Sequence, residues 1–161
     1  MHRYEESDES LTKTFLDIVE ERFGSLQFLK FKLIYDTKKR IKQGKLILAT
    51  VELPSPKIKF FSRDKIAVDG YDLLIIVDKK MWELANEVDR RRVFSHELRH
   101  IFLDEKGDVK LIGHEIEDFY AELKLNGDDP EWQKKLGMLV SDIYEQEKQM
   151  LKEGKPKKKE K

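Results

Sequence analysis

Apolar residues near the start of the chain recur at the spacing of a helix. They are Leu11, Phe15, Ile18, Val19 and Phe23, which follow Asp8 and Ser10 and precede Gly24. Positions three and four apart share one face of a helix, and Asp or Ser can cap its start. The pattern therefore predicts an amphipathic helix that ends at Gly24. The polar residues 1–7 before it are expected to be frayed.

The next part of the chain has the pattern of β-strands. Apolar and mostly basic residues alternate over 29–35, and apolar stretches follow at 45–51 and 58–61. Prolines within 54–56 interrupt this run, and we expect an edge or a connection there because proline cannot donate to a ladder. The continuous apolar run within 71–77 predicts a buried strand.

Helical patterns return after this strand. A short helical turn is predicted at 79–85, around Trp82. Asn86 is a good cap for a longer helix, because a polar side chain here can accept from the first free N–H groups. This helix is predicted to continue through 94–102 and to break at the charged, Gly-containing stretch 104–108.

Two more helices are predicted in the last third of the chain, one over 113–123 and one that begins near Trp132. The order of elements predicts an α+β fold, with an N-terminal helix, a small antiparallel or mixed sheet, and helices grouped after it. We expect one domain over residues 1–152 and a disordered, Lys-rich tail over 153–161.

Composition removes several classes of protein from consideration. The chain has 32 Lys and Arg against 32 Asp and Glu, so no global field favours nucleic acid or an anionic membrane. It contains no cysteine, which excludes disulfides, Cys-based zinc fingers and thiol nucleophiles. No apolar run approaches the ~18 residues of a membrane span, and the start lacks the apolar core of a signal peptide. We expect a soluble cytoplasmic protein, and a solvated loop at the basic cluster 38–45.

A His-Glu-x-x-His motif at residues 96–100 carries the candidate chemistry. On a helix, His96 and His100 are one turn apart and point the same way, so both imidazoles can reach one metal ion. Glu97 lies beside them and can take a proton from a metal-bound water. The apolar residues of 94–102 occupy another arc, which predicts a helix buried on one side and facing a cleft on another.

A catalytic zinc needs three protein ligands and an open position for water. The chain has four histidines, and His114 follows the motif closely enough to be the third ligand. A glutamate as third ligand stays open, with Glu115, Glu117 and Glu122 available. The metzincin pattern requires Gly and His where Leu103 and Lys106 stand, so that class is excluded.

Residues 93–101, the Asp/Gly-rich loop after them and residues 113–119 resemble the phage-type zinc metallopeptidases. The resemblance covers roughly residues 45–123 and extends more distantly to SprT-like (Spartan-like) zincins. It implies a zincin-like fold, Zn²⁺ on His96, His100 and His114, and Glu97 as the catalytic base. The Cys-rich ribbon and DNA-binding parts of many SprT-like proteins are missing here, so DNA-linked substrates are not implied.

The sequence thus predicts a zinc metallopeptidase that acts on peptides or proteins, with no membrane or nucleic-acid partner. Asp118, one turn after His114, is expected to orient a ligand or to serve as a cap or in a salt bridge. Strand 71–77 is expected to present an edge to an extended peptide, and Arg99 to be solvated. The alternative is a catalytically silent metal-binding regulatory or interaction protein with a zincin fold. A weaker alternative is a non-enzymatic protein that binds nucleic acid through the basic cluster 38–45 and the Lys-rich tail.

Overall fold

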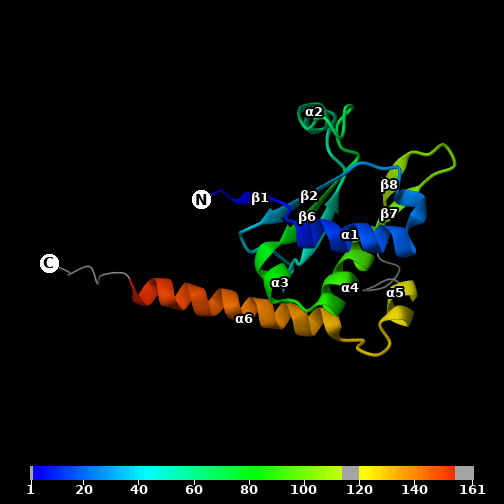
Figure 1. Cartoon of the computed structure of the whole chain (residues 1–161). Coiled ribbons are helices and arrows are strands. Elements are labelled where there is room, and N and C mark those ends of the chain that lie inside the picture. Colours follow the sequence, from blue (N-terminus) through cyan, green and yellow to red (C-terminus); the bar gives the residue numbers. More distant parts are fainter. Residues whose placement is uncertain (1, 114–119, 155–161) are drawn as a thin grey trace.

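The computed structural model describes residues 2–113 and 120–154. Its architecture is α+β, as predicted (Figure 1). The strands are β1 (Tyr4–Glu6), β2 (Phe31–Asp36), β3 (Ile41–Lys42), β4 (Lys45–Leu46), β5 (Ala49–Glu52), β6 (Leu73–Asp78), β7 (Ile101–Leu103) and β8 (Val109–Leu111). The helices are α1 (Glu9–Arg22), the 3-10 helix η1 (Gly24–Leu26), α2 (Pro56–Phe61), α3 (Lys79–Leu84), α4 (Glu87–Leu98), α5 (Tyr120–Leu125) and α6 (Trp132–Glu153).

The main sheet is mixed and has the strand order β1-β2-β6-β5. Strands β2 and β6 are parallel, with Phe31 opposite Leu73, and the other pairs are antiparallel. The apolar run of β6 fits its central place, because a strand buried on both faces has little need of polar positions. The prediction that strand 71–77 offers an edge is wrong, since β6 is paired on both sides. The edge on this side of the sheet is β5.

Helices α1 and α4 pack side by side in the same direction against one face of the sheet. Phe15 on α1 contacts Phe94 on α4, with ring centroids 5.6 Å apart, and both belong to the core. Near the end of α1, the ring of Phe23 lies 4.8 Å from the guanidinium of Arg99, just after α4. Near its start, Asp8 accepts a 2.9 Å bond from the hydroxyl of Tyr35, close to the end of β2. The carboxyl end of α4 therefore lies at the end of the sheet where β2 begins.

Segment 56–61 is a helix, so the prediction of a strand at 58–61 is wrong. Ser55 accepts a 3.2 Å bond from the N–H of Ile58, and Pro56 stands in the first turn, where its missing N–H is no loss. Figure 1 shows α2 projecting from one end of the sheet, away from α6. Residues 53–55 connect β5 to α2, in agreement with the connection expected at these prolines, and Pro56 begins the helix.

The N-terminal residues form β1, so the prediction that residues 1–7 are frayed is also wrong for residues 4–6. Tyr4 pairs with Asp36 on β2, and Arg3 donates two bonds of 3.1 and 3.0 Å to the carboxylate of Asp36. The side chain of Asp36 is buried, and this fork-shaped contact neutralises its charge.

The predicted helix starts and the last helix agree with the structure. Asp8 caps α1 by accepting a 2.9 Å bond from the N–H of Leu11, and Asn86 caps α4 by accepting one of 2.8 Å from Asp89. In α6 the buried side chains Trp132, Leu136 and Val140 form the predicted stripe. Within the two described ranges, no helix is long and apolar enough to cross a bilayer.

Candidate metal centre

The His-Glu-x-x-His motif lies across the end of α4. The helix stops at Leu98, and the N–H of His100 donates a 3.1 Å bond to the carbonyl of Glu97. This tightened last turn is common at helix ends and keeps the two histidines on one side. The ring centroids of His96 and His100 are 5.5 Å apart, with planes at 76°. The prediction that the helix continues to residue 102 is wrong.

A β-hairpin replaces the predicted continuation of the helix and holds the second histidine. Strand β7 follows directly and pairs with β8, with Ile101 opposite Leu111. The next pair along the ladder is His100 and Ile112, where the N–H of Ile112 donates a 2.7 Å bond to the carbonyl of His100. The Nδ1 atom of His100 lies 2.7 Å from the carbonyl oxygen of Ile112. Because a carbonyl only accepts, Nδ1 carries the proton and Nε2 carries the lone pair that a metal needs.

Three side chains of the motif bring potential metal ligands together. The ligand atoms of His96, Glu97 and His100 all lie within 4.8 Å of one another. His96 is buried, with 3 % of its surface exposed, so its position is fixed by packing. Two imidazole nitrogens and a carboxylate oxygen are ligand types that suit Zn²⁺. The residues present therefore fit a divalent transition metal.

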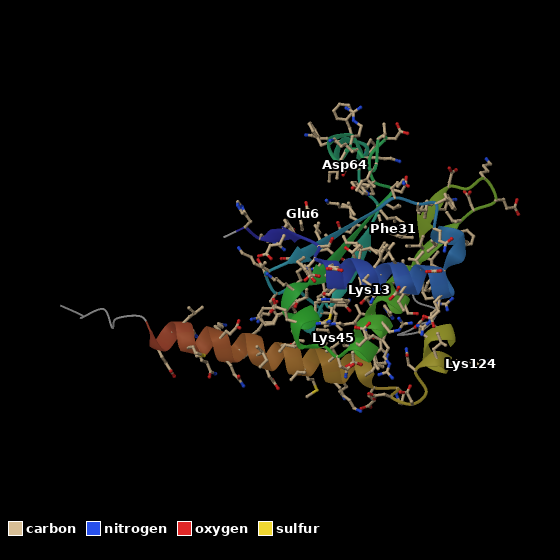
Figure 2. All side chains as sticks on the ribbon, viewed as in Figure 1. Glu6, Lys13, Phe31, Lys45, Asp64 and Lys124 are labelled. Atoms are coloured by element: carbon tan, nitrogen blue, oxygen red, sulfur yellow. The ribbon has the colours of Figure 1, made fainter. Side chains whose placement is uncertain are left out.

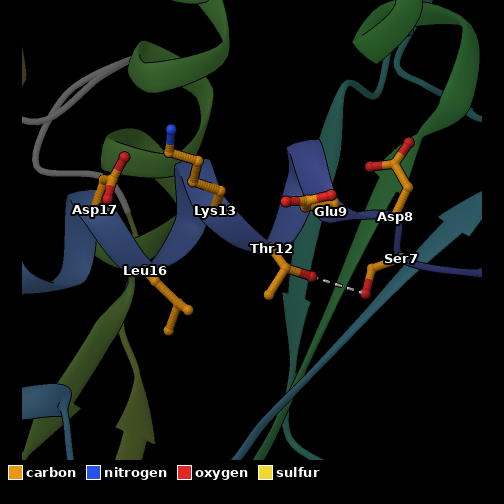
Figure 3. A pocket seen from close by; sticks show the side chains of 7 residues that line it. All are labelled: Ser7, Asp8, Glu9, Thr12, Lys13, Leu16 and Asp17. Carbon is orange, nitrogen blue, oxygen red and sulfur yellow. Dashed lines mark hydrogen bonds between the residues drawn. The ribbon is translucent and has the colours of Figure 1, made fainter.

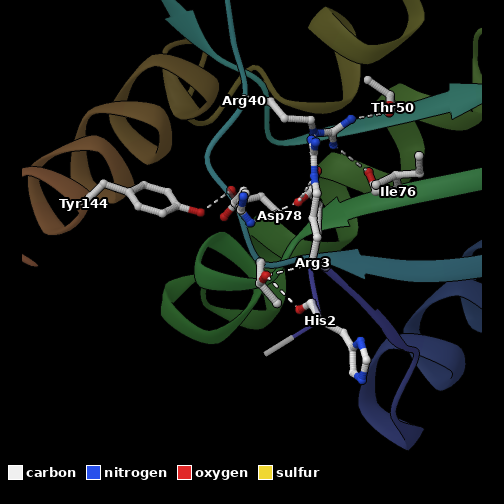
Figure 4. A network of polar contacts seen from close by, with 10 residues as sticks. His2, Arg3, Arg40, Thr50, Ile76, Asp78 and Tyr144 are labelled. Carbon is white, nitrogen blue, oxygen red and sulfur yellow. Dashed lines mark hydrogen bonds and ion pairs between the residues drawn. The ribbon is translucent and has the colours of Figure 1, made fainter. Parts of the chain in front are cut away.

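The carboxyl group of Glu97 has an unusual protonation equilibrium. Burial raises the pKa of Glu97 to about 8, and the positive charge of Arg40 acts in the opposite direction. Arg40 is held in place by bonds of 2.8 Å to Thr50 Oγ1 and 3.1 Å to the carbonyl of Ile76, and it faces Asp36 at 3.5 Å (Figure 4). The cation near the glutamate is thus fixed by the sheet. A carboxyl group with a pKa near neutrality can both take and give a proton.

A comparison with models of protein families shows which family contains this chain. A family model described as "Putative phage metallopeptidase" matches residues 2–140. The chain belongs to this phage metallopeptidase family. Neither a curated protein nor a solved structure matches it in the other two comparisons. Membership in a metallopeptidase family implies a bound metal ion and peptide or protein substrates, and the motif at the end of α4 is a group that can hold the metal.

Part of the predicted site lies outside the described residues. His114, the predicted third ligand, and Asp118, its predicted companion, are among them, as are Glu115 and Glu117. Glu122 is described and lies on α5. The group of ligand atoms within 4.8 Å consists of His96, Glu97 and His100 and does not include Glu122.

Glu122 instead binds Ser95 on α4 and Arg99 directly after it, and the sequence predicted Arg99 to be solvated. Its buried carboxylate accepts a 2.7 Å bond from the hydroxyl of Ser95 and a 3.0 Å bond from Nε of Arg99. The expectation that Arg99 is solvated is therefore wrong. Ser95 on α4 and Arg99, the residue that caps its end, stand four positions apart and therefore lie on the same side. That spacing was the signal for a buried polar partner.

Arg40 is a second contact that sequence reasoning missed. It falls in the basic cluster 38–45, which we expected to be solvated, and its neighbours Lys38, Lys39 and Lys42 are indeed exposed. The side chain of Arg40 is only 16 % exposed because it turns inward to the sheet. Its partners are distant in sequence, so no local pattern points to them.

Two surface hollows lie along α1, and neither is lined by the motif histidines. The first has a volume of about 420 Å³ and lies over the outer face of α1, around Thr12 and Leu16 (Figure 3). The second has a volume of about 460 Å³ and lies between α1, the start of β2 and the segment after α2. Leu16 lines both hollows, so they adjoin.

Proposed function

We propose that this protein is a zinc-dependent metallopeptidase with Glu97 as its general base. His96, His100 and His114 are the proposed zinc ligands. The observation that carries the proposal is the approach of the His96, Glu97 and His100 ligand atoms to within 4.8 Å of one another. Family membership supports the same activity.

The choice of His114 as third ligand is supported by the hairpin. Ile112 is bound to His100 through both its N–H and its carbonyl oxygen. His114 follows Ile112 by two positions, and two residues of chain span at most about 7 Å. The hairpin therefore limits how far His114 can be from the two motif histidines. A third imidazole leaves the fourth position of a tetrahedral zinc open for water.

The proposed chemistry is hydrolysis of a peptide bond. Zinc held here would lower the pKa of a coordinated water and stabilise negative charge on the carbonyl oxygen of the substrate. Glu97 accepts the proton of the attacking water on its carboxylate and then delivers that proton to the leaving amine. Burial raises the pKa of Glu97 to about 8, and a metal cation held by the motif histidines would lower that pKa and so favour the ionised carboxylate that a general base needs. Asp118 is proposed to orient one of the ligands.

The substrate is proposed to bind as an extended strand along β5. This strand pairs with β6 on one side, with Val51 opposite Ile75, and it forms the edge of the sheet on the other. Edge strands carry N–H and C=O groups that can pair with an added peptide. Helix α4 packs beside β5, so a peptide along this edge is brought to the side of the sheet that carries the motif.

Metal content and hydrolysis together test the proposal. Elemental mass spectrometry of the untagged, dialysed chain is expected to find about one zinc per chain, the stoichiometry of one catalytic site. His114→Ala should lose most of it. Glu97→Gln should keep the zinc and lose cleavage of fluorescently labelled casein, because only the base is removed.

Each outcome has a distinct meaning. Full hydrolysis by Glu97→Gln would refute the role of this glutamate. Zinc retained by His114→Ala would indicate that the third ligand is a carboxylate. The zinc content of Glu122→Gln would then show whether that carboxylate is Glu122. Bound zinc without cleavage of any protein or peptide would identify the chain as a silent metal-binding member of the family.

A further inference from the structure

A group of large apolar side chains on and after α2 is exposed to solvent. It consists of Ile58, Phe60, Phe61, Ile66 and Val68, and we call it the apolar platform. Phe61, Ile66 and Val68 are 74 %, 72 % and 71 % exposed. Isolated exposed apolar residues are common, but five within eleven positions form a patch of the kind that marks a binding surface. Figure 2 shows this region, labelled at Asp64, projecting from the end of the sheet.

The backbone that carries the apolar platform is firmly held. Asp64 accepts bonds of 2.8 and 2.7 Å from the N–H groups of Ile66 and Ala67 and one of 2.5 Å from the hydroxyl of Tyr71. Ala67 is buried beneath them, with 2 % of its surface exposed. These contacts fix the loop that presents Ile66 to solvent. Exposed side chains on a fixed loop lose little entropy on binding a partner.

A glycine at the end of this loop allows its backbone to pack closely against α2. Gly70 has a φ of +87°, and a Cβ at this position would lie 2.0 Å from the carbonyl oxygen of Lys59. The two backbones therefore touch where no side chain fits. Lys59 also pairs with Asp72 at 3.2 Å, and Asp72 accepts a 2.8 Å bond from the N–H of Lys30 next to β2. The apolar platform is thereby anchored to the main sheet.

The second hollow continues the apolar platform toward α1. Ile66 and Tyr71 form one wall of this space of about 460 Å³, and Leu16, Val19 and Phe31 are among the residues of the opposite side. Leu16 is 55 % exposed. An apolar side chain of a partner that contacts Ile66 can therefore enter a recess lined mainly by apolar residues.

The apolar platform lies at the same end of the sheet as the candidate metal centre. Strands β2 and β6 begin here, with Phe31 opposite Leu73, and β5 ends here, with Glu52 opposite Leu74. The carboxyl end of α4 lies at this end too, because Arg99 lies over the ring of Phe23. A chain that leaves the edge of β5 at Glu52 therefore meets the apolar platform next.

The exposed charges around the apolar platform are mostly positive. Lys57, Arg63 and Lys65 are exposed, as are Asp64 and Asp69, which leaves an excess of one positive charge among these exposed side chains. Bonds from the N–H of Ala67, the hydroxyl of Tyr71 and the N–H of Ile66 keep the pKa of Asp64 below its ordinary value, so Asp64 carries its negative charge. The surface therefore complements apolar residues that are flanked by carboxylates.

We propose that the apolar platform and the adjoining hollow dock an apolar, acid-flanked segment of an unfolded protein substrate whose cleaved portion lies along β5. This inference rests on the proposed peptidase function. It assigns the chain a preference for unfolded proteins that display such segments over short peptides. A projecting, preorganised surface beside an edge strand captures the substrate at a second place and raises its local concentration at the site.

Binding and cleavage of a defined unfolded protein test the docking surface. The probe is reduced, carboxamidomethylated α-lactalbumin, an acidic unfolded chain, and lysozyme treated in the same way is its basic counterpart. Binding is measured on the full chain carrying Glu97→Gln, so that the probe stays intact. Phe61→Ser with Ile66→Ser should weaken binding of the acidic probe about tenfold or more, because these are the two most exposed side chains of the apolar platform.

A matched control variant replaces two similarly exposed apolar side chains at a distant place on the surface. Met150 and Leu151 near the end of α6 are 69 % and 72 % exposed, and their double serine variant should bind the probe as the parent does. With Glu97 intact, the platform variant should lose cleavage of the acidic probe by the same factor as binding. It should cleave a short peptide copied from the cleaved site at the parental rate, because such a peptide cannot reach the apolar platform.

The outcomes separate the docking surface from the peptidase activity. Probe binding that depends on Phe61 and Ile66, without any cleavage, would retain the surface and refute the activity. Cleavage that is equal in parent and platform variant would retain the activity and overturn the docking surface. If the platform variant binds the probe as the parent does but no longer binds phosphatidylserine vesicles, the proposed docking surface is overturned in favour of a membrane surface. If it binds the probe but loses a dimer that the parent forms in sedimentation, the surface is overturned in favour of contact with a second copy.

Discussion

His100 and Ile112 exchange two hydrogen bonds, both 2.7 Å long, across the ladder of the β7–β8 hairpin. One of them fixes the imidazole of His100 through Nδ1. A histidine at a frayed helix end would be free to rotate, whereas this one is oriented by a neighbouring strand. Partners of this kind commonly change metal affinity by roughly 10- to 100-fold when they are removed. The hairpin is therefore a functional part of the site.

Gly107→Ala is predicted to weaken metal binding through this hairpin. Gly107 has a φ of +83° in the turn between β7 and β8, and a Cβ there meets no atom within 4 Å. Its cost is therefore backbone strain alone, about 1 kcal/mol. We expect zinc affinity, measured by competition with a chelator, to fall by about two- to fivefold.

Gly44→Ala is the matched control for this variant. Gly44 has a φ of +75° in the turn between β3 and β4, and its Cβ would also meet open space. The same strain placed in a hairpin that does not touch His100 should leave zinc affinity unchanged. Equal loss of affinity in both variants would show that global stability, and not the β7–β8 hairpin, controls the site.

Glu122→Ala is predicted to destabilise the protein by about 3 kcal/mol, because it leaves Ser95 and Arg99 without the carboxylate that both bind. Glu122 is fully buried. Asp128→Ala is the comparison, since Asp128 is 70 % exposed and pairs with Arg92 at 2.6 Å. A pair this exposed contributes about 1 kcal/mol or less. Urea unfolding of the two variants measures the difference, and equal losses would contradict the role of Glu122 in joining α5 to α4.

Two facing aspartates are predicted to give opposite pH dependences of stability. Asp36 and Asp78 are in-register partners on β2 and β6, and both are buried. Burial raises the pKa of Asp36, but hydrogen bonds from Arg3 and from the N–H of Lys38 outweigh it and hold the pKa below its ordinary value. For Asp78 burial prevails and raises the pKa, although Tyr144 donates a 2.6 Å bond to it.

The signs of the two contributions follow from these shifts. Asp36 stabilises the fold above its unfolded pKa of about 4 and loses this contribution as the pH falls. Asp78 contributes most below that value and loses its contribution as the pH rises through its raised pKa. Asp36→Asn should therefore flatten the loss of unfolding free energy in acid, and Asp78→Asn should make stability rise more steeply above about pH 4. Denaturant titrations from pH 2 to pH 7 measure both, and parallel profiles would contradict the assignment.

Local signals in the sequence predicted the parts of the structure that depend on neighbouring residues. Asp8 and Asn86 begin helices because their side chains accept from N–H groups three positions on. The spacing of His96 and His100 placed both on one side of a helix turn, and the structure keeps them there. The family resemblance that rested on this motif is confirmed by the match over residues 2–140.

The errors arose where a local pattern had two meanings. Pro56 within an apolar run predicts the interruption of a strand, whereas after Ser55 it is the first-turn residue of a helix. Apolar residues after His100 continued the helical pattern, but the turn at 104–107 folds them into a hairpin. Pairing across the turn could not be distinguished from a helix break by periodicity alone.

Contacts between distant segments were beyond local reasoning. The bonds of Arg40 to Thr50 and Ile76 depend on the order of strands in the sheet. The place of β5 at the edge likewise follows from strand order, which a single sequence does not specify. The contact of Ser95 with Glu122 is partly accessible, because a serine and an arginine one turn apart on a buried helix require a partner.

The parallel pairing of Phe31 with Leu73 has a consequence for how the chain folds. Neither half of the central pair can find its partner until the chain has been synthesised beyond Asp78, and β3, β4, β5 and α2 all lie in the intervening crossover. Closing so long a loop is slow compared with forming α1. During synthesis the apolar side chains of β2 therefore stay unpaired until β6 has emerged, and α2, with its exposed Phe60 and Phe61, lies in the loop that closes when the two strands pair.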